Sequence, residues 1–404
     1  MGKLSKVSKF NALVGILASL VMFEVGFLSK DLIKAESTKD YADQVVRKCS
    51  KEKYRPSCYD EEIPKLMDKI SMREAFDVAR VVQDAEGDGY LYCHVLGHNL
   101  SARETAKDPS KWKEVIAKCP SGMCSNGCIH GSFQERFRVE NLSDEEIDKL
   151  IPELSEVCEE KPGWKPTGLE QASCYHALGH LVMYIAGGDI DKSNKVCDVV
   201  SVKGKNDFLQ MCYDGNFMQI FQPLEPEDFE LVRDIAPKNK EEAMLFCGKY
   251  TGLKKSSCHQ ESWPLYFSEI MTPKGLIKFC GYSNDDTVQK RCYNALFYII
   301  AAQFKLDQIK IKDFCGGLPQ PKQGQCFANS ASRMIETDYR LMDKALFLCN
   351  EARVYGVQDV CYKELVFYST FNYHPDSSEF RHLCDSLPNE WKEKCYSGNN
   401  SYRP

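Results

Sequence analysis

The sequence predicts an all-α protein, an α/α solenoid of about ten helix-pair repeats. Three observations support this class: cysteines recur about every 34 residues, an aromatic residue follows most of the cysteines that mark the period, and no convincing alternating strand pattern appears. The 404 residues are 43% hydrophobic, enough to bury a core, which excludes wholesale disorder. Acidic residues (58) outnumber basic ones (52) and there is no basic tail, so no nucleic-acid partner is expected.

The chain begins with a predicted targeting segment. Residues 1–10 form a short basic end, expected on the cytoplasmic side, and residues 11–29 form an apolar helix. That run is short for a membrane span and slightly long for a signal-peptide core, so an uncleaved signal anchor and a cleaved signal peptide both stay open. Either alternative places the rest of the chain outside the cytoplasm, membrane-anchored or secreted, with membrane contact through this segment. Residues 30–48 are read as a linker.

The 20 cysteines predict a ladder of disulfides in an oxidising compartment. Eighteen of them fall into nine pairs of near neighbours, and closing loops of about 10–16 residues stabilises the fold by about 2.5–3 kcal/mol each. Redox catalysis would favour a Cys-x-x-Cys motif, and the sequence has none. The expected pairs are Cys49–Cys58, Cys119–Cys128, Cys158–Cys174, Cys197–Cys212, Cys247–Cys258, Cys280–Cys292, Cys315–Cys326, Cys349–Cys361 and Cys384–Cys395.

The remaining two cysteines, Cys93 and Cys124, do not fit this ladder. One interpretation is a bridge between them, linking an irregular repeat to the next. The other is a free pair beside the neighbouring histidines, acting as thiolate ligands or as a redox switch.

The spacing of the cysteine pairs divides the array into three parts. The second cysteines of the last five pairs are 34 or 35 residues apart, which indicates regular repeats over 246–398. Earlier spacings are longer, so 49–221 is expected to hold irregular repeats with insertions. Residues 222–245, rich in proline and acidic residues, are the largest insertion and separate the two blocks.

One repeat shows why a helix pair is expected. From Cys361 to Phe371, apolar residues recur at helical steps, and Pro375 then ends the helix. A second helix, capped by Asp376 or Ser377, runs to about Cys384. A single pair has too little core to fold alone, so neighbouring pairs must stack.

This pattern resembles the Sel1-like and tetratricopeptide solenoids, and most of all cysteine-rich, secreted Sel1-like repeat proteins. The segment 177–191, through to Cys197, is similar to the Sel1 order of Leu-Gly, an apolar helix, a glycine turn, an acidic residue and a second helix, and 95–97 repeats its start. The resemblance covers about 49–398 as architecture. It implies a right-handed superhelix whose concave face binds a protein or peptide, and it does not imply catalysis.

Five of the eight histidines fall between residues 94 and 180. Aligning the repeats on the cysteine column places His94, His130, His176 and Asp214 at one position, and later repeats lack metal-binding residues there. Two of these repeats carry a second histidine one helical turn on, His98 and His180, and residues four apart share a helix face. We therefore predict a metal site from a set of six residues, His94, His98, His130, His176, His180 and Asp214.

Two function classes follow from the sequence. The first is an extracytoplasmic scaffold that binds a protein or peptide on its concave face. The alternative is a transition-metal protein, a carrier or a metalloenzyme, for which a donor set of imidazole and carboxylate suits Zn, Cu(II) or non-haem Fe. The histidines also have a plain structural interpretation as polar residues satisfied inside the stack. Common catalytic motifs, including His-Glu-x-x-His and Gly-x-Ser-x-Gly, are absent, so no catalytic residue is assigned.

Overall fold

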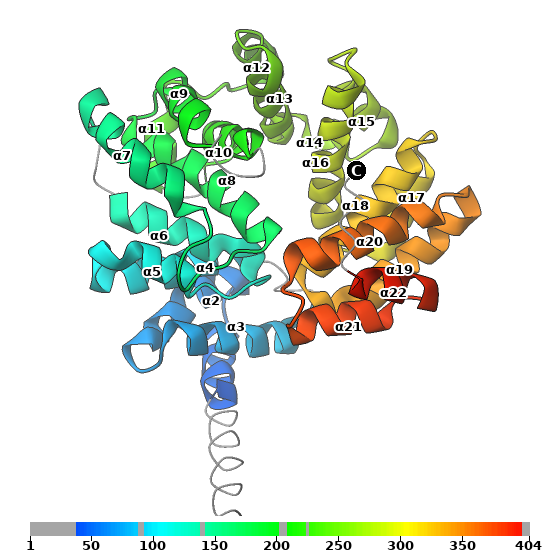
Figure 1. Cartoon of the computed structure of the whole chain (residues 1–404), viewed down its shortest axis with the longest axis horizontal. Coiled ribbons are helices and arrows are strands. Elements are labelled where there is room, and N and C mark those ends of the chain that lie inside the picture. Colours follow the sequence, from blue (N-terminus) through cyan, green and yellow to red (C-terminus); the bar gives the residue numbers. More distant parts are fainter. Residues whose placement is uncertain (1–37, 88–92, 138–141, 202–207, 224–225, 398–404) are drawn as a thin grey trace, which may run out of the picture. The chain divides into compact units, whose positions relative to one another are not determined.

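The computed structural model in Figure 1 describes residues 38–87, 93–137, 142–201, 208–223 and 226–397. Over these ranges the protein is helical, and the one extended pairing is an isolated bridge between Lys161 and Trp164. The all-α class expected from the sequence is confirmed. The predicted targeting segment, 11–29, lies outside the described residues. None of the described helices has both the length and the apolar composition needed to span a bilayer.

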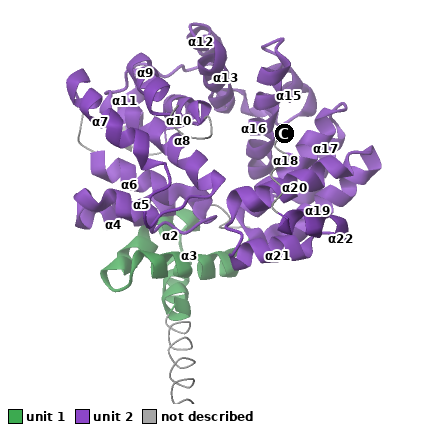
Figure 2. Cartoon of the chain, in the orientation of Figure 1, with its two compact units in different colours: residues 1–90 green, residues 91–404 purple. Residues whose placement is uncertain are grey.

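The chain divides into two compact units, residues 1–90 and 91–404 (Figure 2). The first unit contains a helix over 38–49, α2 (Arg55–Lys65), a 3-10 turn and α3 (Met72–Glu86). α3 begins with a capping box, in which Ser71 and Glu74 satisfy each other's backbone N–H groups. Ile63 and Phe76 are fully buried in this unit.

The second unit holds the remaining helices, and Figure 1 shows them in sequence order by colour. Most are short, and many start at an Asp, Asn, Ser or Thr whose side chain accepts a backbone hydrogen bond. They are α4 (His94–Lys107), α5 (Trp112–Ala117), α6 (Gly127–Phe137), α7 (Asp144–Val157), α8 (Gly168–Ile185), α9 (Ile190–Val200), α10 (Leu209–Phe221), α11 (Pro226–Val232), α12 (Lys240–Cys247), α13 (Gly252–Glu261), α14 (Phe267–Ile270), α15 (Pro273–Cys280), α16 (Asp286–Gln303), α17 (Gln308–Gly316), α18 (Lys322–Thr337), α19 (Met342–Glu351), α20 (Gln358–Asn372), α21 (Ser378–Ser386) and α22 (Asn389–Tyr396).

Ten disulfides join adjacent helices, and every cysteine of the chain is bridged. In a typical bridge, Cys158 at the end of α7 pairs with Cys174 within α8. The nine near-neighbour pairings are those that the spacing predicts. Cys93 and Cys124 form the tenth bridge, across 31 residues, so they are not free thiols. Ten bridges within one chain indicate an oxidising, extracytoplasmic environment.

The helices of the second unit pack in a repeat-like manner around two apolar clusters. The first cluster runs from Trp112 to Cys258 and the second from Ile270 to Cys395. The unit also makes a long-range contact, because α20 packs against α8. There the α-carbon of Gly168 is so close to Phe371 that an added Cβ would lie 2.2 Å from the ring.

Candidate metal centre

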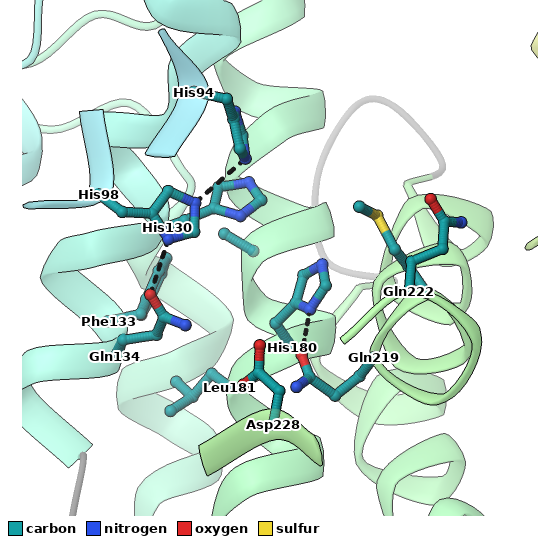
Figure 3. Close-up of a pocket in the computed structure, with 12 residues that line it drawn as sticks. His94, His98, His130, Phe133, Gln134, His180, Leu181, Gln219, Gln222 and Asp228 are labelled. Atoms are coloured by element: carbon teal, nitrogen blue, oxygen red, sulfur yellow. Dashed lines mark hydrogen bonds between the residues drawn. The ribbon is translucent and has the colours of Figure 1, made fainter. Parts of the chain in front are cut away.

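The first two histidines of the candidate site come from one face of α4. α4 begins at His94, and His98 follows one turn later. Their Nε2 atoms are 3.1 Å apart (Figure 3). His98 is buried, with 6% of its surface exposed, and His94 is half-buried.

The start of α4 is fixed by a disulfide and an unusual turn rather than by a polar cap. Its N-cap residue, Cys93, makes no side-chain capping bond and is bridged to Cys124 instead. Cys124, Ser125 and Asn126 all have positive φ angles, of 51°, 46° and 57°. Three successive non-glycine residues in the left-handed region of φ and ψ store backbone strain, and such strain clusters at functional sites. Gly127, directly after this turn, lies against α4, where an added Cβ would be 2.2 Å from the carbonyl oxygen of His94.

A third imidazole, that of His130, comes from α6. Its ring centroid is 5.0 Å from that of His94 and 5.1 Å from that of His98. α6 reaches this position because Gly131 lies directly against α4, where an added Cβ would be 2.1 Å from the carbonyl oxygen of His98. One ring nitrogen from each of His94, His98 and His130 falls in a group whose members are all within 4.8 Å of one another.

α8 repeats the arrangement of α4. The Nε2 atoms of His176 and His180 are 3.2 Å apart, and Gly215 of α10 lies where a Cβ would be 2.0 Å from the carbonyl oxygen of His176. The His130 ring lies near both histidines of this second pair, with centroid distances of 5.6 Å to His176 and 5.4 Å to His180. The five imidazoles are therefore gathered in one place.

Burial keeps these imidazoles neutral. It lowers the pKa of His94 to about 4, against the backbone hydrogen bonds that favour its charged form. Burial also lowers the pKa of His98 and His130 well below the usual value, and neighbouring imidazoles lower it further. Burial also lowers the pKa values of His176 and His180. Neutral imidazole is the form that binds metal ions.

Two glutamines orient the second histidine of each pair. Nδ1 of His98 is 2.8 Å from Oε1 of Gln134, and Nδ1 of His180 is 2.6 Å from Oε1 of Gln219 (Figure 3). An amide oxygen only accepts, so Nδ1 donates and Nε2 keeps its lone pair. Sequence reasoning missed both glutamines. Gln134 could have been found, because it follows His130 by one helical turn.

A cavity of about 470 Å³ adjoins the site, and His94, His130 and His176 form part of its lining. Asp214 also lines this cavity, but the structure does not place it in the three-histidine group. It lies instead near Glu261, and both side chains are buried. Burial raises the pKa of both carboxyls, and the charge of Asp214 raises that of Glu261 further.

The donor set of the site is nitrogen only. Cys93 and Cys124 supply no thiolate because they are bridged to each other. Imidazole ligands suit Zn, Cu, Fe and Ni rather than the hard cations Mg and Ca. Three histidines also leave a coordination position open, as in zinc sites that bind water or substrate.

No family model, curated protein or solved structure matches this chain. The case for its function therefore depends on the geometry of the histidine cluster.

Proposed function

We propose that the second unit binds a transition-metal ion through His94, His98 and His130. The observation that carries this proposal is the convergence of three ring nitrogens, from two helices, within 4.8 Å of one another. Two nitrogens bound to one tetrahedral ion at about 2.0–2.1 Å lie about 3.3 Å apart. The separation of 3.1 Å between the Nε2 atoms of His94 and His98 fits that requirement.

The hydrogen bonds of the two rings also support an ion between them. A neutral imidazole has one N–H. In His98 it points to Gln134, so the lone pair on Nε2 of His98 faces Nε2 of His94 at 3.1 Å. A cation between the two Nε2 atoms would be bound by both rings. Burial opposes a proton in that role, because it lowers the pKa of both rings.

The test is elemental analysis of the full chain, purified from an oxidising compartment without a chelator or a histidine tag. We expect stoichiometric Zn, Cu or Fe in the wild type and loss of the ion bound by these three ligands in the variant His94→Ala/His98→Ala. The matched control is His382→Ala, an exposed histidine of α21, which should retain full loading. Far-ultraviolet circular dichroism and a count of free thiols check that each variant is folded and oxidised. Absence of metal from the wild type under every supply would contradict the proposal.

We also propose that the repeat-like packing is that of an α/α solenoid of Sel1-like type, anchored to a membrane or secreted. The ten bridges between adjacent helices support this reading. Binding of a protein or peptide to a concave face stays a prediction. The cavity beside the histidines has a volume of about 470 Å³, in the range of small-molecule pockets, so a small ligand could reach the metal ion.

A further inference from the structure

The chain contains a second pair of histidines built to the same plan as the first. His176 and His180 lie one turn apart on α8, as His94 and His98 do on α4, and the Nε2–Nε2 separations are 3.2 and 3.1 Å. In each pair the second histidine bonds through Nδ1 to a glutamine of the next helix against which it packs. Histidines that only fill the core would not need the same Nε2–Nε2 separation in both pairs, nor a glutamine that orients the second ring of each pair.

The hydrogen bond of His180 leaves one of its lone pairs available for a cation. Nδ1 of His180 donates to Gln219, so Nε2 of His180 carries a lone pair. Nε2 of His176 lies 3.2 Å from it, close to the separation of two nitrogens bound to one tetrahedral ion.

The surroundings of His180 add negative charge at this second position. Asp228 of α11 is buried and lines the same small pocket as His180. Figure 3 shows Asp228 beside His180 and Gln219, on the far side of the pocket from His94. A buried carboxylate beside the ligands stabilises a bound cation without replacing an imidazole.

We propose that His176 and His180 bind a second transition-metal ion, so that the protein holds a dinuclear centre with His130 between the two ions. His130 is the one histidine whose ring contacts all four others, with centroid distances of 5.0 to 5.6 Å. The second ion has two protein imidazoles in its immediate pair, so water or a small ligand in the adjoining cavity completes its coordination. This inference extends the proposed function, but it makes a separate claim about stoichiometry.

The experiment counts ions bound by the full, oxidised chain. Metal-free protein is titrated with Zn(II), and a parallel sample with Cu(II) is followed by electron paramagnetic resonance. We expect two equivalents in the wild type, with Cu(II) spectra broadened by coupling between two nearby ions. His94→Ala/His98→Ala and His176→Ala/His180→Ala should each retain one equivalent. His130→Ala should weaken the first site, for which His130 is a ligand, more than the second.

Two milder variants keep the test valid if the alanine variants misfold. Gln219→Leu should weaken one equivalent about 10–100-fold and leave the other unchanged, and Gln134→Leu should do the same for the opposite ion. A single equivalent in the wild type, lost with His94 and His98 and kept without His176 and His180, overturns the second site while the first stands. No binding at all overturns the proposed function as well.

Discussion

Gly131 lies against the backbone of His98 so closely that a Cβ at position 131 would be 2.1 Å from the carbonyl oxygen of His98. The contact is between two backbones, so no side-chain rotation can relieve an added methyl group. It sets the spacing between α4 and α6, and through it the distance from His130 to the first histidine pair.

Replacing Gly131 by alanine is therefore expected to separate α4 from α6. We expect a loss of about 1–3 kcal/mol in the free energy of unfolding, together with a large loss of affinity for the first metal ion. Urea denaturation and metal titration measure the two effects. Gly317→Ala is the control, because the nearest atom to its added methyl, at 3.0 Å, belongs to the side chain of Pro273. Unchanged metal affinity in Gly131→Ala would contradict this role for the contact.

The disulfide between Cys93 and Cys124 should matter for the site as well as for stability. Closing a loop of 31 residues contributes about 4 kcal/mol by the chain-entropy estimate, against about 3 kcal/mol for the shorter loop of Cys384–Cys395. The double variant Cys93→Ser/Cys124→Ser is expected to lower both the free energy of unfolding and the metal affinity, because α4, which begins at His94, loses the bridge that fixes its start. Cys384→Ser/Cys395→Ser should lower stability alone. Equal metal affinities in the two double variants would contradict the prediction.

Metal binding should stabilise the folded protein by mass action. An ion at about 100 times its dissociation constant adds about 2.7 kcal/mol per site to the free energy of unfolding. Thermal denaturation with added Zn(II) and with a chelator measures this difference, and the shift should disappear in His94→Ala/His98→Ala/His176→Ala/His180→Ala. A shift that persists in this variant would place the stabilising ion elsewhere.

Buried carboxyls should make stability fall as pH rises. Burial raises the pKa of Glu364 to about 7 from its ordinary 4.5, and it raises the pKa values of Asp214 and Glu261 in the same direction. The folded protein thus holds protons that the unfolded chain has released. The stabilisation is complete below about pH 4 and is lost as pH rises through about 7.

The variant Glu364→Gln tests this dependence. Since glutamine does not titrate, its unfolding free energy should fall less between about pH 5 and pH 8 than that of the wild type, by at most about 3 kcal/mol. Glu393→Gln, at an exposed position of α22, should follow the wild-type profile. A Glu364→Gln profile parallel to the wild type would show that this carboxyl is charged in the folded protein.

Much of this molecule could be predicted because its disulfides are local. In a helical chain, a bridge between cysteines 9–16 residues apart joins consecutive helices, so the regular spacing predicts the repeats. The number of cysteines predicts the oxidising compartment. The column of His94, His130 and His176 could also be predicted, because residues at equivalent places in stacked repeats lie along one wall.

Other features depend on long-range geometry that spacing does not encode. Asp214 occupies the same column as the histidines, but the chain directs it toward Glu261 of α13 rather than into the three-histidine group. Ser125, Asn126 and Gly127 are turn-forming residues, but their types alone do not show that Cys124, Ser125 and Asn126 would all adopt positive φ angles. Gln219 lies five residues after Asp214. The sequence pattern searched for was a second residue four positions after the first, as in His94 and His98, so it did not identify Gln219.

The contact between Gly168 and Phe371 affects how the helices of the second unit should unfold. Repeat arrays whose units touch only their neighbours can fray from either end, since each terminal pair is lost at small cost. Here α8 and α20, about 190 residues apart in sequence, hold each other in place. The second unit should therefore resist end fraying and melt in one cooperative transition, so that the histidine helices stay protected from proteolysis until the whole unit opens.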